Sequence, residues 1–331
     1  MPVGAAKPVA LGFLGVAKEA TPGTPVASTN YIPVTKFDPF DNQRWLDDLG
    51  WRGSMATEYG EIQGVVNSEC DLGGDVFADS FGWLVAGILG DITTTGGGAP
   101  FTHACALKNS GDGQPTSYTY TDYYGRTDSN PTRQYAGSKI LSLTLKGSAE
   151  GLLTWEGKSN GFASAVAAKP TASFTAVTAS PAYECVASIG GSASALVEDF
   201  EIDLVRQGGP IFNVDGDKTP YEIFAGKLGV AGKLTTIMET DLELNRFVGA
   251  TAGVTALDFN ATHGAGAGAV QVLTHMTQAQ YTVAKLVRGK EYFTVEIDFK
   301  AVANTTDVGS SGGYSPCKIT LQNALPSGTY V

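Results

Sequence analysis

The chain has 331 residues, of which 43% are hydrophobic and 17% charged, and its formal net charge is −11. This charge argues against ordinary nucleic-acid binding, because lysine and arginine make the contacts to phosphates. No apolar run approaches the roughly 18 residues that a membrane-spanning helix needs, and the 42 glycines and 15 prolines favour strands joined by turns. The composition therefore predicts a mainly β protein without a membrane span.

Residues 1–56 are predicted to form an extended arm that finds its order by lying on something else, because they are rich in proline and have little periodicity. Core strands are expected only after this arm, in a single β domain over residues 57–331. The stretch EYGEIQGVVNSECDL begins that domain and predicts a bent or bulged hairpin, because Gly60 and Gly64 interrupt its strand-forming residues.

One flanking α-helix is predicted at about residues 75–89, in DVFADSFGWLVAGILG. Asp75 is expected to cap its first turn and Gly90 to close its last turn. An apolar stripe at helical spacing is expected to pack the helix on a sheet. The stripe consists of Phe77, Phe81, Leu84 and Ile88.

Strands are predicted again in TSYTYTDYY, SKILSLTLKGS and GLLTWEG, with long loops between elements. Three later segments alternate acidic with apolar residues. The acids are Asp199, Glu201 and Asp203 in DFEIDLV, Glu239, Asp241 and Glu243 in ETDLELN, and Glu296 and Asp298 in FTVEIDF. Because successive side chains of a strand point to opposite faces, each segment predicts a half-buried strand with its acids outward.

These acidic faces have three interpretations. The first is a solvated exterior that keeps the protein soluble and discourages edge-to-edge pairing. The second is a cation site shared by neighbouring strands. The third is a surface that faces DNA without binding it.

No catalytic motif has the surroundings that its chemistry needs. GSSGG fits the spacing of a nucleophile elbow, but neither a strand nor a helix flanks it, so Ser311 is predicted to be a loop serine. In NVDGDKTP, the early glycine and the missing glutamate favour a hairpin turn over a calcium loop. His103 is predicted to lie in a loop, and all three histidines are interpreted as solvated or structural. We therefore predict no catalytic residue, no metal and no cofactor, and a protein that is not an enzyme.

The cysteines are far apart and form no CxxC pair, so we predict free buried thiols rather than a zinc ribbon or a redox motif. They are Cys70, Cys105, Cys185 and Cys317.

Several motifs follow one another along almost the whole chain. They are KEATPGTPVASTNYIPV, DLGWRGSM, GGDVFADSFGWLVAGILGD, PTSYTYTDYY, YAGSKILSLTLKGSAEGLLTWEGKSNG, VDGDKTPYEIFAGKLGVAGKLT, and AVANTTD followed by SPCKITLQN. In their order and spacing they resemble the major tail tube proteins of long-tailed, non-contractile bacteriophages.

The resemblance implies a β-sandwich or barrel-like subunit with one flanking helix. Six copies would close into a ring, and rings would stack into a tube through which genomic DNA leaves the head. The implied partners are other copies of the chain, a tape measure protein, and tail tip or terminator proteins, while DNA passes without specific binding. The implied location is the virion tail, assembled in the host cytoplasm.

At least one acid-faced strand is then expected to line the channel, because a wall of carboxylates repels phosphates and lets the polymer slide. Residues 163–199 match the family least well, and an outer decoration is considered there. Two other classes stay open: a carbohydrate-binding or adhesive β-sandwich, and a hydrolase on a β scaffold. The adhesive alternative uses aromatics predicted to be exposed, namely Tyr118, Tyr120, Tyr123 and Tyr124.

Overall fold

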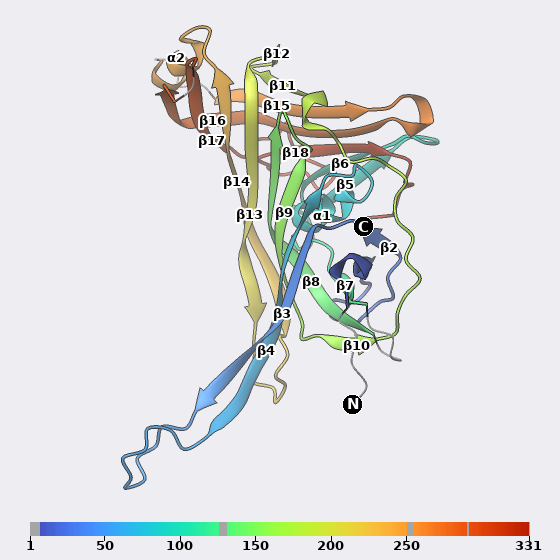
Figure 1. Cartoon of the computed structure of the whole chain (residues 1–331), viewed down its shortest axis with the longest axis vertical. Coiled ribbons are helices and arrows are strands. Elements are labelled where there is room, and N and C mark those ends of the chain that lie inside the picture. Colours follow the sequence, from blue (N-terminus) through green and yellow to red (C-terminus); the bar gives the residue numbers. More distant parts are fainter. Residues whose placement is uncertain (1–6, 126–130, 250–253, 290, 331) are drawn as a thin grey trace.

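The computed structural model describes residues 7–125, 131–249, 254–289 and 291–330, and most of them lie in strands (Figure 1). The predicted mainly β fold is confirmed. The described residues also contain two α-helices rather than the single one expected.

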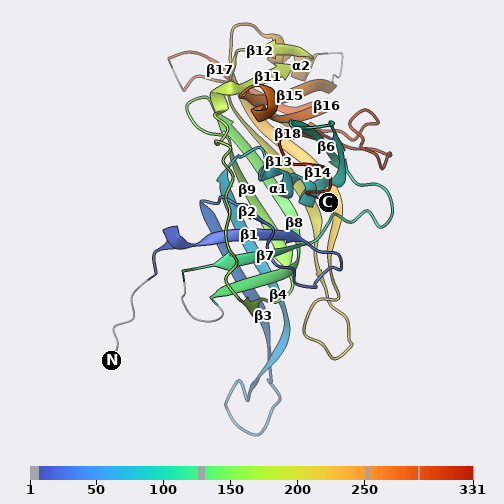
Figure 2. The same ribbon diagram turned by 90° about the vertical axis from the view of Figure 1, so that its right-hand side faces the viewer.

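The first half of the chain forms one structural unit, which we call unit 1. Its elements are β1 (Phe13–Lys18), β2 (Asn30–Ile32), β3 (Lys36–Asp47), β4 (Glu61–Asp75), α1 (Phe81–Leu89), β5 (Gly90–Thr95), β6 (Phe101–Leu107), β7 (Tyr118–Tyr123), β8 (Thr132–Ser148), β9 (Thr154–Gly161) and β10 (Ala165–Ala167). Antiparallel pairing gives the order β3-β4-β9-β8. The early part of β8 also joins a second sheet, β2-β1-β7-β8-β10, whose strands cross the long strands (Figure 2).

The second half, unit 2, repeats this arrangement. Its elements are β11 (Cys185–Ile189), β12 (Ser192–Ser194), β13 (Val197–Ile211), β14 (Glu222–Ile237), α2 (Leu242–Val248), β15 (Val254–His263), β16 (Val270–Val287), β17 (Thr294–Ala301) and β18 (Lys318–Asn323). The order β13-β14-β17-β16 matches β3-β4-β9-β8, and β12-β11-β15-β16-β18 matches the second sheet of unit 1. Short 3-10 helices lie at Val9–Leu11, Ala182–Glu184 and Gly266–Gly268.

The two units also share three irregularities, while a further register shift in β13, between Val197 and Asp199, has no counterpart in the described part of β3. A β-bulge interrupts three strands of unit 1 and each corresponding strand of unit 2. The bulge between Gln43 and Trp45 in β3 corresponds to the one between Arg206 and Gly208 in β13. The bulge between Tyr118 and Tyr120 in β7 corresponds to the one between Thr255 and Leu257 in β15. The bulge between Ile140 and Ser142 in β8 corresponds to the one between Tyr281 and Val283 in β16. Since a bulge changes the register by a defined step, coincident bulges show that the chain contains an internal structural repeat.

The units are joined edge to edge. β8 of unit 1 pairs with β13 of unit 2 from Asp199 opposite Ser148 to Val205 opposite Ser142. The result is one main sheet with the order β3-β4-β9-β8-β13-β14-β17-β16. The hairpin β5–β6 of unit 1 pairs with β18 of unit 2 and links the halves a second time. Residues 163–199 connect the units and include β10 to β12; whether they decorate the outside of an assembly stays a prediction.

Helix α1 is shorter and more deeply buried than predicted. It begins at Phe81 because the β4–β9 ladder continues to Asp75, so that Asp75 ends a strand instead of capping the helix. All of its residues are buried, not only one stripe. Gly90 closes it as expected, with φ of 86°. A Cβ on Gly82 would lie 2.3 Å from the Tyr330 ring, so this glycine permits a close contact.

The expectation that core strands begin only after residue 56 is wrong in part. Leu14 and Val16 of β1 are fully buried. The loop after β1 is held by the buried Glu19 carboxylate. It accepts hydrogen bonds from Ser117 Oγ (2.9 Å), Thr119 Oγ1 (2.6 Å), and the backbone N–H groups of Gly23 (2.9 Å) and Gly137 (2.8 Å). These bonds explain why a proline-rich segment acquires a fixed path on unit 1.

Replacing Glu19 with alanine is expected to lower the free energy of unfolding by about 2–4 kcal/mol, because several donors lose their acceptor in a buried site. Urea titration of the monomer measures the change. The exposed Glu58 provides the control, and Glu58→Ala should stay within about 0.5 kcal/mol of wild type. Equal stability of the two variants would contradict the assigned role.

The cysteines are free thiols as predicted, and Cys70, Cys105 and Cys317 are buried while Cys185 is half-buried. His103 lies in β6 rather than in a loop and is fully buried. Its ring nitrogens contact Thr94 Oγ1 at 2.8 Å and Asn323 Oδ1 at 3.2 Å, so it has a structural role.

Candidate functional site

The main sheet has one covered face and one open face. Along β13, Phe200, Ile202 and Leu204 point into the core, whereas Asp199, Glu201 and Asp203 lie on the open face. Along β17, Val295, Ile297 and Phe299 are buried, whereas Glu296 and Asp298 lie on the open face. Both predicted strands and their alternation are confirmed.

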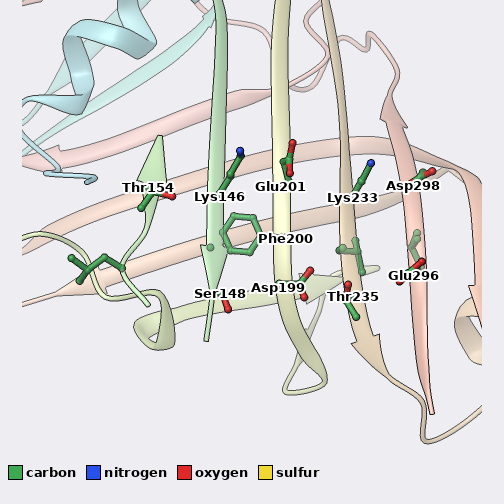
Figure 3. A pocket seen from close by; sticks show the side chains of 14 residues that line it. Lys146, Ser148, Thr154, Asp199, Phe200, Glu201, Lys233, Thr235, Glu296 and Asp298 are labelled. Carbon is green, nitrogen blue, oxygen red and sulfur yellow. The ribbon is translucent and has the colours of Figure 1, made fainter. Parts of the chain in front are cut away.

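Lysines from neighbouring strands separate these acids. The pairing registers place Lys146 of β8 opposite Glu201, Glu201 opposite Lys233 of β14, and Lys233 opposite Asp298. Figure 3 shows these four side chains side by side, above a second row. That row consists of Ser148, Asp199, Thr235 and Glu296. The open face therefore alternates in charge across the strands, although it is acidic along β13 and β17.

The contacts on the open face are those of a solvated surface. Thr144 Oγ1 donates a hydrogen bond to Asp203 Oδ1 at 2.6 Å, and Lys146 Nζ lies 3.3 Å from Glu156 Oε1. The side chains of Lys146 and Glu156 are 37% and 66% exposed. An exposed pair of this kind contributes about 0–1 kcal/mol and is weakened by salt. These charges consequently shape the local field more than they stabilise the fold.

A shallow cavity of about 600 Å³ follows this row across the strands. Its lining includes Lys146, Glu201, Lys233 and Asp298. In the described part of the chain, no group of three or more His, Cys, Asp or Glu side chains could hold a metal ion. The shared cation site considered for the acidic faces thus has no ligand set among these residues.

The third acidic segment is not a strand. Glu239 lies in the turn after β14, Asp241 is the N-cap residue of α2, and Glu243 lies in the first turn of that helix. Acidic residues at this end and Arg246 in the last turn complement the helix dipole. Over so few residues, the alternation of acidic and apolar side chains in ETDLELN fits a strand as well as a helix. The acidic residues at the start of α2 and Arg246 at its end were the evidence for a helix.

Glu243 has a structural role instead of facing the open side. Its carboxylate lies 3.1 Å from Arg246 Nη1 and accepts a hydrogen bond from Tyr281 Oη at 2.7 Å. These contacts attach α2 to β16. The prediction that Glu239, Asp241 and Glu243 share one strand face is therefore wrong.

Two buried cations escaped the sequence analysis. Arg206 of β13 is 3% exposed, and its guanidinium donates hydrogen bonds to the carbonyl oxygens of Ile88 (2.6 Å) and Leu89 (3.1 Å) at the end of α1. Burial lowers the pKa of Arg206 to about 10. Lys139 of β8 donates to Gln114 Oε1 (2.9 Å) and Glu222 Oε1 (3.1 Å), and burial lowers its pKa. Both side chains bridge the two units and do not face the open side.

A single histidine of β16, His275, contacts two carboxylates in the second sheet of unit 2. His275 Nδ1 contacts Asp258 Oδ1, and Nε2 lies 3.4 Å from Asp307 Oδ1 and 3.0 Å from Thr277 Oγ1. The hydrogen bond with Asp258 raises the pKa of His275, and the charge of Asp307 adds to this effect, whereas burial and Lys318 oppose it. The protonated imidazole is therefore favoured in the folded state.

These contacts of His275 are expected to make stability depend on pH. Because the folded pKa is raised, the stabilisation is fully present below the unfolded pKa of about 6.5 and is lost as pH rises through the folded value. Urea unfolding from about pH 6 to pH 9 should show this loss in wild type and a smaller one in His275→Asn. The same slope in both proteins would contradict the assignment to His275.

The motifs rejected from the sequence have local structural roles. Ser311 lies in a loop as predicted, and its backbone N–H donates to Asp91 Oδ2 at 2.7 Å. The segment NVDGDKTP forms the turn between β13 and β14. The aromatics of the adhesive alternative are not exposed: Tyr118, Tyr120 and Tyr123 are buried, and Tyr124 is half-buried. They were mistaken for surface residues because β7 is covered on both faces.

Among the described residues, no helix has the length and apolarity to cross a membrane. The fold and the open face define a mainly β protein in which two repeated units share one long sheet. The profile of a family described as phage tail tube protein matches residues 10–301, and the chain belongs to this family. It is thus a structural tail tube protein and a component of the virion. None of the curated proteins matches the chain.

Proposed function

We propose that the chain assembles into rings with six subunit positions, that the rings stack into a tail tube, and that genomic DNA leaves through this tube. The observation that carries the proposal is the open face of the main sheet. It extends over every strand from β3 to β16 and is solvated and charged, while the opposite face is covered by the helices and the second sheets except on the projecting ends of β3 and β4. A sheet of this kind is suited to form the wall of a water-filled channel.

The proposed wall repels DNA through the acids of β13 and β17, while their alternation with lysines moderates the repulsion. Lys146 and Lys233 each lie opposite a carboxylate, so neither offers an isolated positive charge to a phosphate. Binding of DNA needs several such cations, whose counterions are released together. These two lysines therefore form no basic track along β8 or β14, and we assign the open face to contact with DNA in transit.

The tips of the two long hairpins, residues 48–60 and 212–221, point to the same end of the molecule (Figure 1). The second tip contacts the first hairpin, since the backbone N–H of Val66 in β4 donates a hydrogen bond to the carbonyl oxygen of Lys218 at 2.9 Å. The first tip exposes Leu49, Trp51 and Met55. Large apolar side chains at an exposed tip are typical of protein contact sites, and we assign these to the next ring.

Replacing Trp51 and Met55 with serine should therefore leave the monomer folded and shorten the tubes, because stacking loses its apolar contacts. Electron microscopy measures tube length at matched concentration. The double change Val214→Ser with Asp215→Ser on the other tip tests whether both tips contribute. Tubes of unchanged length in the Trp51 and Met55 variant would exclude this contact.

We further propose assembly in the host cytoplasm, with a tape measure protein inside the growing tube and terminator or tip proteins at its ends. Family membership supports self-assembly into a tube. Electron microscopy of the purified chain tests the function. Hollow rings or tubes are the expected result, whereas monomers that stay dispersed at high concentration, or that bind glycans, would overturn it.

A further inference from the structure

Two edges of the main sheet have no strand partner in the described part of the chain. β3 pairs only with β4 along its length. The last part of β16, from Val283 to Val287, pairs only with β17. Such edges present unpaired N–H and C=O groups and are ready to pair with another chain.

The internal repeat identifies the partner of each edge. β3 occupies the position in unit 1 that β13 occupies in unit 2, and β16 occupies the position of β8. Within the chain, β8 and β13 form the antiparallel junction between the units. The free edge of β3 thus corresponds to the edge of β13 that pairs with β8, and the free edge of β16 corresponds to the edge of β8 that pairs with β13.

We propose that β16 of one copy pairs with β3 of the next copy, antiparallel and in the register of the β8–β13 junction. The proposal rests on the proposed tube function and identifies the contact that closes each ring. Each chain then fills two neighbouring positions of the ring, and contacts within and between chains alternate around it. Such head-to-tail contacts generate a closed ring when their rotation closes.

The shared bulges fix the register. When the bulge of β16 is aligned with that of β8, Lys285 takes the position of Thr144 and Val283 that of Ser142. When the bulge of β3 is aligned with that of β13, Phe40 takes the position of Asp203. Because Thr144 faces Asp203, Lys285 is expected to face Phe40 of the second copy.

The side chains on the two edges complement each other. β16 contains no aspartate or glutamate. Lys285 lies near its end, and Arg288 follows its last residue. β3 carries Asp38, Asp41 and Asp47 together with Lys36 and Arg44, and Lys36 Nζ lies 3.6 Å from Asp38 Oδ2. In the proposed register Asp38 lies diagonally across from Lys285, a distance within reach of a long side chain. Opposite charges at this spacing favour the register over one displaced by a residue.

The edges also expose apolar side chains, since Phe40 is 54% exposed and Val283 is 42% exposed. Pairing would cover part of this area and supply apolar burial to the interface. Pro39 lies in β3 and lacks an N–H group. A proline of this kind is tolerated on an edge strand, and its position supplies no donor to a ladder with the next copy.

The β8–β13 junctions within chains and the β16–β3 junctions between chains would alternate around the ring. Because the two kinds of junction are alike, the ring has twice as many similar positions as it has chains. If the ring has the six positions proposed above, three chains fill it instead of the six copies that the resemblance implied, and its mass is about 103 kDa, three times the chain mass of 34.4 kDa. A ring of six chains would instead contain twelve units of the repeat.

Cysteine cross-linking tests the contact. Paired residues of antiparallel strands have Cα atoms about 4.5–5.5 Å apart, a separation that a disulfide spans. Mild oxidation of assembled Phe40→Cys/Lys285→Cys protein should give covalent multimers that are dispersed by a reductant. Either single variant should give none, and neither should Phe40→Cys/Lys233→Cys, which moves the second cysteine to the middle of the sheet.

Wild-type protein separates failure of this contact from failure of the function. Without hollow tubes in wild type, the proposed function itself fails. Tubes without cross-links in the assembled double variant would overturn the contact. If that variant does not assemble, a reconstruction of wild-type tubes decides: continuous β16–β3 pairing between chains supports the proposal, and any other neighbour of these edges overturns it.

Discussion

Replacing Arg206 with methionine is expected to lower the free energy of unfolding by about 2–4 kcal/mol, because carbonyl oxygens in a buried site lose their donors. The guanidinium caps the end of α1 from β13, through Ile88 and Leu89, and so connects unit 1 to unit 2. It also lies 3.4 Å from the carbonyl oxygen of Ala225 in β14. Methionine fills much of the same volume but donates no hydrogen bond.

Urea titration of the monomer measures the change, and two variants sharpen it. Arg206→Lys should be intermediate, because one ammonium group cannot reproduce a planar fork with several donors. Lys227→Met, on an exposed position of β14, is the control and should lie within about 0.5 kcal/mol of wild type. Stability of Arg206→Met close to that of the control would show that the cap contributes little.

The sequence predicted features that depend on one segment at a time. Alternation identified β13 and β17, and Gly90 was correctly expected to end α1. The sequence also indicated that Arg206 is buried, although this was not recognised. Arg206 follows Phe200, Ile202 and Leu204 at alternate positions and so lies on the same side of the strand. A charged residue on the apolar side of a strand indicates a buried polar contact, although its partner in α1 lies far away in the chain.

Features that depend on the register between distant strands were not predictable. The acids of β13 were correctly placed on an open face, but Lys146 and Lys233 became their neighbours only through pairing with β8 and β14. The internal repeat was also missed, because it is a repeat of topology and bulges. The backbone follows the same path in both units while the side chains at equivalent positions differ, as Thr144 and Lys285 do.

The charge of the open face is expected to set the rate at which DNA is released. Changing Asp199, Glu201 and Asp203 to lysine should leave assembly intact and slow DNA release by about tenfold at low salt, because the wall would gain a basic track along β13. These side chains point away from the core, so the fold should tolerate the change. Release is measured as the rate of DNA appearance from purified phage carrying the variant.

Two matched variants distinguish attraction from simple loss of acids. The neutral variant Asp199→Asn/Glu201→Gln/Asp203→Asn should slow release only slightly, because neutral amides do not attract phosphates as lysines do. Lys146→Glu/Lys233→Glu, on the same face, should not slow it at all. Added salt should restore the lysine variant towards the wild-type rate, because screening weakens exposed charges. If the lysine variant releases DNA at the wild-type rate at low salt, β13 does not line the channel. If all three variants are equally slow, charge is not the property that the channel uses, since an altered wall shape would act without regard to sign.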